Sequence, residues 1–264
     1  HGGIRYLVSG QLALVRQALA EKAVWLSTAP DFVCDQPFML PLKGGMKSWQ
    51  MRAGVALYQR LSGRRSTTLS AKHALEMEPC LEMPNLSGAA IYHDARIDDP
   101  DALIRALLQD AAAHGACIAN HLNCVGLLLH NDKLAGLEVQ DQLMRERFVI
   151  NTAMAVNATG PWAQNLASQL LPGQTRARLT ASKGIHVLTP ALTRSYAIAL
   201  SGKSEHAFIL PWKGISLIGT TDDVHSGDLN NCTATGEEIE HLKQKVLRLL
   251  PAERACFDTI LGAF

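Results

Sequence analysis

The sequence predicts an α/β fold with α+β character, in which a mixed or antiparallel sheet accompanies a strand–turn–helix unit. The apolar run Ala153–Val156 stops at small and polar residues, and Pro161 then opens an amphipathic segment. This order is typical of a buried strand followed by a helix, because proline is favoured in the first helical turn. Strand-like runs follow one another over residues 116–156 and again after residue 183. Such a series predicts an α/β sheet with an antiparallel addition.

The first third of the chain is expected to alternate helices with short extended segments. Apolar residues recur at helical spacing over 12–26 and again over 49–61. Residues 31–44 contain Pro37, Pro41 and Gly44, which predict a short strand and a loop. A short helix is expected over 70–77 and a strand over 88–93.

Asp99 and Pro100 predict the start of a further helix, since aspartate caps helix N-termini and proline fits the first turn. His114-Gly115 predicts where that helix ends. The strands expected after it are 116–120, 124–129, 134–139, 147–151 and 153–156, with a turn at 131–133.

After residue 183 the pattern predicts strands, then one helix, then a last strand. Thr235 and Glu238 match a capping box, which predicts a helix that begins there and ends before Pro251. The strands expected in this part are 185–188, 197–200, 207–210, 216–219 and 259–264.

Composition excludes several classes of function. The chain has 264 residues with 25 basic and 24 acidic side chains, and the basic ones are scattered, so no nucleic-acid surface is expected. No apolar run reaches the roughly 18 residues of a spanning helix. The six cysteines form no C-x-x-C pair and no histidine pair has zinc spacing, so we expect reduced thiols and no metal site.

Five segments, in this order, resemble the FAD-dependent glycerol-3-phosphate dehydrogenases, and the resemblance covers nearly the whole chain. They are His1-Gly2-Gly3-Ile4-Arg5-Tyr6-Leu7, Asp94-Ala95-Arg96, Asn157-Ala158-Thr159-Gly160-Pro161-Trp162, Lys183-Gly184-Ile185-His186 and Ile218-Gly219-Thr220-Thr221-Asp222. The resemblance implies the fold of the DAO-type FAD-dependent oxidoreductases. Residues 1–30 and 88–180 would belong to a partial Rossmann-like FAD-binding domain, and 31–87 and 181–264 to a substrate-binding domain.

The resemblance also implies an activity. The family oxidises sn-glycerol 3-phosphate to dihydroxyacetone phosphate by hydride transfer to FAD, and the electrons pass to a membrane quinone. The implied partners are therefore glycerol 3-phosphate and a quinone. The implied location is the cytoplasm, peripheral to the inner membrane, and a homodimer is left open.

Two parts of the family pattern are missing from the chain. A flavoprotein of this type holds the FAD pyrophosphate on a G-x-G-x-x-G loop, and no such motif occurs here. The resemblance places that loop before His1 and a further arginine segment after Phe264. We therefore expect an internal fragment of a longer enzyme, inactive and without tight FAD binding when alone.

The N-terminal motif supplies the first candidate site residues. From the residues alone, Arg5-Tyr6 is typical of a surface pair. The resemblance implies instead that Arg5 binds the substrate phosphate and that Tyr6 lines the same pocket. Arginine suits this role because its planar fork makes paired charge-assisted hydrogen bonds. His1, Gly2 and Gly3 would then run beside the isoalloxazine ring, where glycine permits close backbone approach.

His186 is the second predicted catalytic residue beside Arg5. A histidine on a strand is commonly a core residue, but the resemblance implies that it faces the carbinol as proton acceptor or orienter. Lys183 would support phosphate or flavin charge, or is an exposed turn lysine. Thr221 would orient substrate, or caps the end of its strand.

Further FAD contacts are implied around the Asn157–Trp162 turn. Ala158, Thr159 and Gly160 would approach FAD through their backbone, at the start of a helix whose N-terminus favours an anion. Val125 would pair its backbone with the adenine edge.

Two alternatives to the dehydrogenase stay open. The first is a related flavin oxidase that uses oxygen or acts on another hydroxy or amino acid, although Arg5 favours a charged substrate. The second is a non-catalytic remnant that kept the substrate domain and lost FAD binding.

Overall fold

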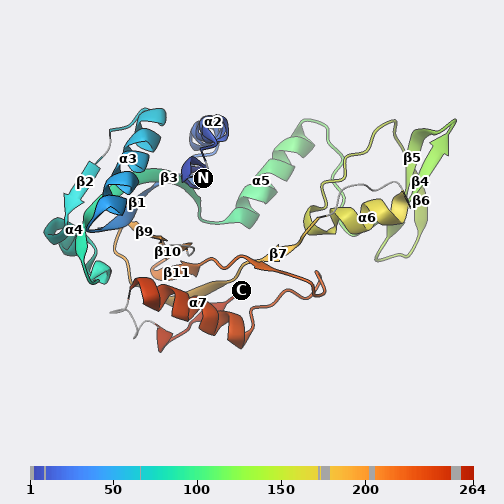
Figure 1. The fold of residues 1–264 in the computed structure, drawn as a ribbon. Coiled ribbons are helices and arrows are strands. Elements are labelled where there is room, and N and C mark those ends of the chain that lie inside the picture. Colours follow the sequence, from blue (N-terminus) through green and yellow to red (C-terminus); the bar gives the residue numbers. More distant parts are fainter. Residues whose placement is uncertain are drawn as a thin grey trace. The chain divides into compact units, whose positions relative to one another are not determined.

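The computed structural model describes residues 3–8, 10–65, 67–171, 173, 179–201, 206–250 and 257–264, without the side chains of Arg5, Val8, Met46 and Lys47. The chain forms two compact units. The first contains His1–Leu103, Lys183–Asp223 and Thr233–Phe264, and the second contains Ile104–Ser182 and Val224–Cys232. Figure 1 shows both units and labels their elements where there is room.

An eight-stranded mixed sheet forms the centre of the first unit, in the order β13-β8-β11-β10-β9-β1-β3-β2. Its strands are β1 (Val33–Lys43), β2 (Thr67–Ser70), β3 (Leu86–Ile97), β8 (His186–Pro190), β9 (Ala197–Ser201), β10 (His206–Trp212), β11 (Ile215–Gly219) and β13 (Gly262–Ala263). Neighbouring strands are antiparallel except β1 and β9, which are parallel and pair through Phe38–Met39 and Ala197–Ile198. This short parallel ladder joins the N-terminal strands to the C-terminal ones.

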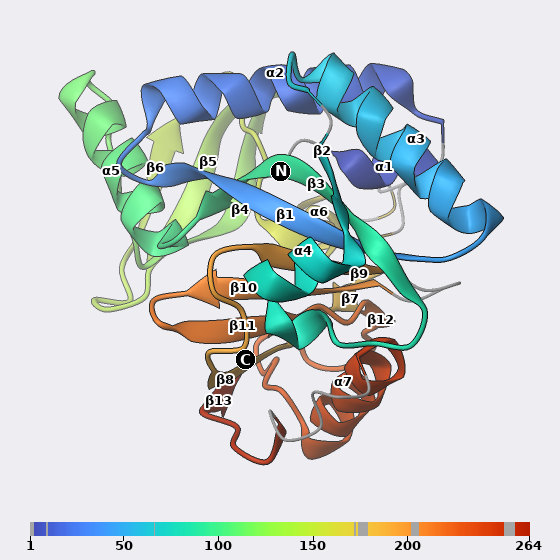
Figure 2. The same cartoon turned by 90° about the vertical axis from the view of Figure 1, so that its left-hand side faces the viewer.

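Helices cover both faces of this sheet, and each face has its own hydrophobic core. The helices are α1 (Ile4–Val8), α2 (Leu12–Thr28), α3 (Met46–Leu61), α4 (Ala71–Met77) and α7 (Gly236–Leu249), with the short helix η1 (Pro79–Leu81). Side chains alternate between the faces of a strand, so Ala197 and Ala199 contribute to the core under α2 and α3. Ile198 and Leu200 contribute to the opposite core with α4 and α7. Figure 2 shows α2 and α3 above the sheet, with α7 below it.

Glu78 connects the two halves of the sheet through a buried carboxylate. It lies between α4 and η1 and has no exposed surface. Its oxygens accept hydrogen bonds from the backbone N–H groups of Arg194, Ser195 and Tyr196, each at 2.8 Å. A buried carboxylate is tolerated when hydrogen bonds replace its lost hydration. The bonds hold the loop that leads into β9.

The second unit contains a three-stranded antiparallel sheet, β4 (Leu122–His130), β5 (Lys133–Asp141) and β6 (Arg147–Asn151), in that order. Asn131 and Asp132, with φ of 49° and 59°, form the two-residue turn between β4 and β5. The helices η2 (Gly160–Trp162) and α6 (Ala163–Leu170) follow. Helix α5 (Pro100–Ala113) and the short strands β7 (Ser182–Lys183) and β12 (Asp223–Val224) lie where the chain passes between the units.

Local signals predicted many elements correctly, and the predicted mixed α/β class is confirmed. Asp99 Oδ1 accepts the N–H of Ala102 at 2.9 Å, as expected of a helix cap. Thr235 and Glu238 form the predicted capping box of α7. The helices expected over 12–26, 49–61 and 70–77 are α2, α3 and α4.

Two predicted strands were wrong. Residues 116–120 and Ala153–Val156 are irregular, and Met154 and Val156 are 78% and 84% exposed. An extended apolar run becomes a strand only when a neighbour satisfies its backbone groups. Among the described residues no strand pairs with either segment.

Some strand lengths also differ from the prediction. The first strand, expected to be short, extends over Val33–Lys43 and includes Pro37 and Pro41. These prolines are four residues apart, so their missing N–H groups fall on the same side of the strand. The last strand is shorter than expected, covering Gly262–Ala263.

The predicted division into an FAD-binding and a substrate-binding domain stays a prediction. The two compact units separate after residues 103, 182, 223 and 232, whereas the predicted functional boundaries lie near 30, 88 and 180.

Glu78→Ala should lower the free energy of unfolding by about 3–5 kcal/mol, because buried N–H groups lose a charged acceptor. Glu78→Gln should lower it less, since one carbonyl oxygen can still accept. Urea denaturation measures both changes. The exposed Glu82→Ala is the matched control and should stay within about 0.5 kcal/mol of the parent. A Glu78→Ala loss equal to that of the control would show that these bonds contribute nothing.

Candidate functional site

His186 begins strand β8, and its neighbours fix the orientation of its ring. Its backbone exchanges two hydrogen bonds with Phe264, at 2.8 and 3.0 Å. The imidazole stacks on the Phe264 ring with 5.6 Å between centroids and an angle of 22° between planes. On the other side it lies over Gly219 of β11, where an added Cβ would be 2.2 Å from His186 Cδ2. Glycine is therefore required opposite this imidazole.

The protonation state of the His186 imidazole suits a proton acceptor. Burial lowers the pKa of the imidazole below its ordinary value of 6.5, so the ring is neutral at pH 7. In the described part of the chain, no side chain hydrogen-bonds either ring nitrogen. A neutral, oriented imidazole can accept a proton from a hydroxyl group that reaches it.

Thr221 supports the backbone beside His186. Its side chain is 3% exposed, and its hydroxyl oxygen accepts the N–H of Ile185 at 3.1 Å. An added Cβ at Gly184 would lie 2.4 Å from Thr220 Oγ1, so only glycine fits between these segments. The hydroxyl of Thr221 therefore holds the backbone of Ile185, just before β8. Its contact with substrate stays a prediction.

Lys183 has partners within the fold. Its ammonium lies 2.8 Å from a carboxylate oxygen of Glu238 and donates to the carbonyl of Thr233 at 2.7 Å. The hydrogen bond from Lys183, followed by that from the Thr235 backbone, lowers the pKa of Glu238 to about 2. Lys183 therefore holds the N-terminus of α7 in place. Its predicted support of phosphate or flavin charge stays a prediction.

The N-terminal motif is described only in part. His1 and Gly2 lie outside the described residues, as does the Arg5 side chain, while the Arg5 backbone belongs to α1. Tyr6 is 37% exposed. Gly3 has a φ of 77°, and an added Cβ would lie 2.9 Å from the Tyr6 ring. Glycine is thus required for packing at this position, and the flavin contacts of the motif stay predictions.

The Asn157–Trp162 turn in the second unit is held by local hydrogen bonds. Asn157 donates to the carbonyl of Ala163 at 2.9 Å and accepts from the Thr159 hydroxyl at 2.7 Å. Ala158, Thr159 and Gly160 are exposed, and no atom lies within 4 Å of a Cβ built on Gly160. A larger molecule can therefore approach the backbone of this turn.

Val125 lies at an irregularity of strand β4. Cys124 pairs with Val139 and Gly126 with Glu138, so Val125 is an extra residue outside the register with β5. Such a bulge leaves the backbone of the extra residue outside the ladder. This geometry suits the predicted backbone contact with adenine, which stays a prediction.

The structure brings only some of the predicted residues together. Lys183, His186 and Thr221 belong to adjoining segments of the first unit, whereas Val125 and residues 158–160 belong to the second. Sequence reasoning missed Phe264 and Gly219 as neighbours of His186, because strand register brings them there over a long chain distance. Among the described residues, no three metal-ligating side chains form a cluster.

The chain matches known proteins over nearly its whole length. The family model described as FAD dependent oxidoreductase matches residues 1–262. A glycerol-3-phosphate dehydrogenase of Mycobacterium leprae is 34% identical over 98% of this chain and 46% of its own length. An alpha-glycerophosphate oxidase of Streptococcus pyogenes is 28% identical over 98% of this chain and 45% of its own.

A solved structure supports the same fold. The crystal structure of a glycerol-3-phosphate dehydrogenase from Bacillus halodurans, complexed with FAD, superposes with a TM-score of 0.76. It is 24% identical and covers 93% of this chain and 46% of that one. The chain thus spans about half the length of the relatives it matches.

Acidification below pH 6.5 should destabilise the first unit in part through His186. Because its pKa is lower in the folded state, the unfolded chain binds the proton more readily, and the free energy of unfolding falls as pH drops. His186→Gln should lose less stability between about pH 7 and about pH 5 than the parent. Urea denaturation at a series of pH values measures the difference. An NMR titration giving His186 a pKa above 6.5 would contradict this interpretation.

Proposed function

Because the chain belongs to the FAD dependent oxidoreductase family, we propose that the complete protein oxidises sn-glycerol 3-phosphate to dihydroxyacetone phosphate with FAD. The names of its relatives support this substrate. The observation that carries the proposal is His186, a neutral imidazole oriented between Phe264 and Gly219 with no hydrogen-bond partner for its ring among the described residues.

In the proposed reaction, the proton and the hydride of the substrate go to different acceptors. The C2 hydroxyl of the substrate gives its proton to His186 while the C2–H bond breaks, which leaves a ketone. FAD, when bound, supplies the acceptor for the hydride. Arg5, which we also assign to the catalytic site, binds the phosphate dianion with Tyr6 beside it, and Lys183 and Thr221 complete the pocket. The phosphate is then fixed at a set distance from the reacting carbon.

Seven residues are proposed to hold FAD. They are His1, Gly2, Gly3, Val125, Ala158, Thr159 and Gly160. The open space at Gly160 and the bulge at Val125 fit close backbone contact with a large planar ligand. A non-catalytic remnant would contain no flavin, so the FAD content of the purified complete protein separates the two proposals.

We propose a membrane quinone as the electron acceptor, with oxygen as the alternative that the oxidase-named relatives favour. The two acceptors differ in a direct test. After anaerobic reduction by substrate, a dehydrogenase is reoxidised faster by a soluble quinone analogue than by oxygen, and an oxidase shows the reverse.

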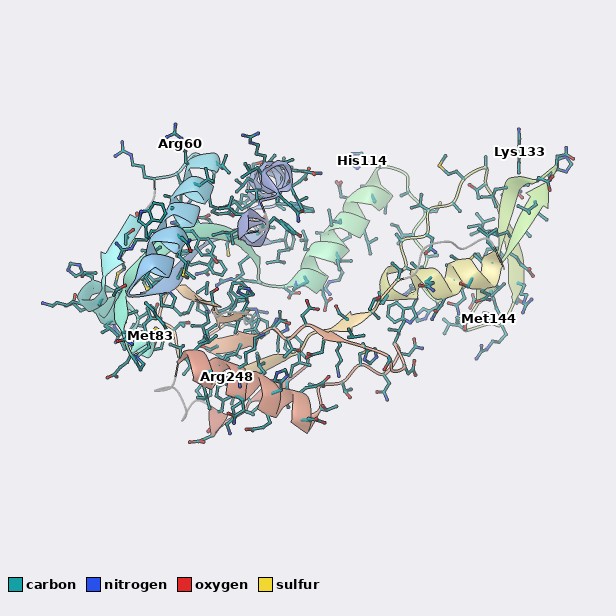
Figure 3. All side chains as sticks on the ribbon, viewed as in Figure 1. Arg60, Met83, His114, Lys133, Met144 and Arg248 are labelled. Atoms are coloured by element: carbon teal, nitrogen blue, oxygen red, sulfur yellow. The ribbon has the colours of Figure 1, made fainter. Side chains whose placement is uncertain are left out.

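Helix α3 supports a proposed peripheral position at the cytoplasmic face of the inner membrane. Residues 36–75 contain no aspartate or glutamate. On α3, Trp49 and Leu57 are 70% and 42% exposed, and Arg52 and Arg60 are exposed beside them. Figure 3 shows Arg60 at one end of α3, pointing away from the unit. Basic and aromatic side chains on one helix suit an anionic lipid surface.

Within the described residues, no helix is long and apolar enough to span a bilayer. The proposed attachment rests on the exposed basic and aromatic side chains of α3. Whether the complete protein forms a homodimer is an independent question that sedimentation would answer.

Arg5→Ala in the complete protein should raise the KM for glycerol 3-phosphate steeply, because a charge-assisted phosphate contact contributes roughly 2–4 kcal/mol in a desolvated pocket. Anaerobic bleaching of the flavin against substrate concentration, together with steady-state kinetics, measures the change. Arg105→Gln, an exposed helical arginine elsewhere, is the control. An unchanged kcat/KM for Arg5→Ala would remove Arg5 from the site.

Arg52→Gln should weaken binding to vesicles that contain anionic phospholipid about fivefold, since each interfacial charge contributes about 1 kcal/mol. Arg105→Gln should bind like the parent. Vesicle sedimentation at low and high salt, with Trp emission as a second signal, gives the affinities. Equal binding of both variants, or equal binding to neutral and anionic vesicles, would rule out the α3 surface.

A further inference from the structure

We propose that the first unit contains a second ligand site, a cavity of about 420 Å³ that binds a small free anion through a phosphate or carboxylate group. The cavity lies between the β8–β9 loop and the turn that joins β10 to β11. This inference does not rest on the proposed function. A volume of this size is in the range of small-molecule sites.

Hydrogen bonds to Glu78 and Ser216 hold the first wall of the cavity in place. It consists of the β8–β9 loop, including Thr193 and Arg194. The carboxylate of Glu78 binds three successive N–H groups of this loop, and Ser216 Oγ accepts the N–H of Leu192 at 2.9 Å. The loop therefore keeps its shape without a ligand.

The second wall is a tight hairpin turn. Lys213 and Gly214, with φ of 49° and 82°, are the two central residues of the turn. The indole N–H of Trp212 donates to the carbonyl of Asp98 at 3.0 Å, and the Lys213 ammonium lies 5.1 Å from the centre of the Trp212 ring. Both side chains line the cavity.

Gln36 and Arg96 form the floor and connect both walls. Gln36 is 4% exposed and donates to the carbonyl of Ser195 at 3.1 Å. Arg96 donates to Gln36 and, at 2.7 Å, to the carbonyl of Pro211. Arg96 also forms an ion pair with Asp98, with 2.6 Å between Nε and Oδ1. The polar groups of the cavity are thus set in place before binding.

The charge of the lining favours an anion. Among the described residues, the lining contains Arg96, Arg194 and Lys213 and no acidic side chain. Asp98 compensates Arg96, and the Glu78 carboxylate lies against the backbone of the loop. The exposed side chains of Arg194, which donates to the carbonyl of Glu76 at 3.2 Å, and Lys213 therefore leave a net positive charge at the cavity. A positive, partly enclosed surface attracts anions.

Thr193 supplies an independent sign of a missing partner. Its side chain is 6% exposed, and its hydroxyl has no hydrogen-bond partner among the described residues. A buried hydroxyl without a partner is costly. An anion oxygen at the cavity wall would provide the acceptor.

This cavity is separate from the His186 site. Ile215 pairs with Pro190 at the cavity end of β8 and β11, and Gly219 pairs with His186 at the other end. Four residues along a strand span about 13 Å. A ligand in the cavity does not compete for His186.

The test uses the complete protein with inorganic phosphate and citrate, against sodium chloride at matched ionic strength. Calorimetry and the thermal unfolding midpoint report binding. Lys213→Asn keeps a residue that tolerates positive φ, and Arg194→Gln keeps the backbone bonds to Glu78. Each should weaken binding of phosphate or citrate about tenfold. Lys133→Gln, an exposed lysine in the second unit, should bind as the parent does.

Thr193→Val gives a second test, in which the unfolding midpoint without ligand and the shift caused by the anion should change in opposite senses. It should raise the unfolding midpoint without ligand, because it removes an unsatisfied hydroxyl, and should reduce the shift caused by the anion. Equal shifts in parent, Lys213→Asn and Arg194→Gln would overturn the proposal, as would no binding of either anion. Vesicles of phosphatidic acid distinguish the source of the phosphate, and binding to them without any response to free anions would also overturn it.

Discussion

The buried carboxylate of Glu78 is the interaction on which the first unit depends most. Within the described residues, the N-terminal and C-terminal strands of the sheet pair directly only through Phe38–Met39 and Ala197–Ile198. Glu78 belongs to the first half and binds the N–H groups of residues 194–196 in the second. Gln36 and Arg96 add side-chain bonds across the same junction. A ladder of two residue pairs is thereby reinforced by polar bonds that direct the chain into β9.

Strands β8 and β11 have chemically different surroundings at their two ends. At one end a neutral imidazole lies against an aromatic ring and a glycine, with its polar neighbours engaged in backbone support. At the other end, basic side chains surround a preformed cavity. Rigid antiparallel pairing of β8 with β11 keeps the two ends apart. Proton chemistry and anion binding can therefore occur on one sheet without sharing residues.

Sequence reasoning succeeded where the cause is local. Asp99, Thr235 and the Asn131-Asp132 turn act on backbone groups a few residues away, and each element was predicted from them. The order of the family motifs predicted His186 as a site residue, and this role stays a prediction. Long-range causes were not visible, because Glu78 binds N–H groups 116 to 118 residues away. The strand predicted over Ala153–Val156 was wrong for the same reason. Its apolar residues give no sign of whether another strand pairs with it, and no described strand does.

Alternation along β9 protects the sheet against misalignment. Ala197 and Ala199 face the ring cluster in which Phe38 stacks on Tyr92 at 5.1 Å and meets Phe208 edge-on at 6.0 Å. Ile198 and Leu200 face the aliphatic layer under α7. A slip of one residue would push branched side chains into the rings and leave voids beneath the helix, so both faces would oppose it together. The alternation of small and large side chains along β9 therefore fixes the register of this strand in the sheet.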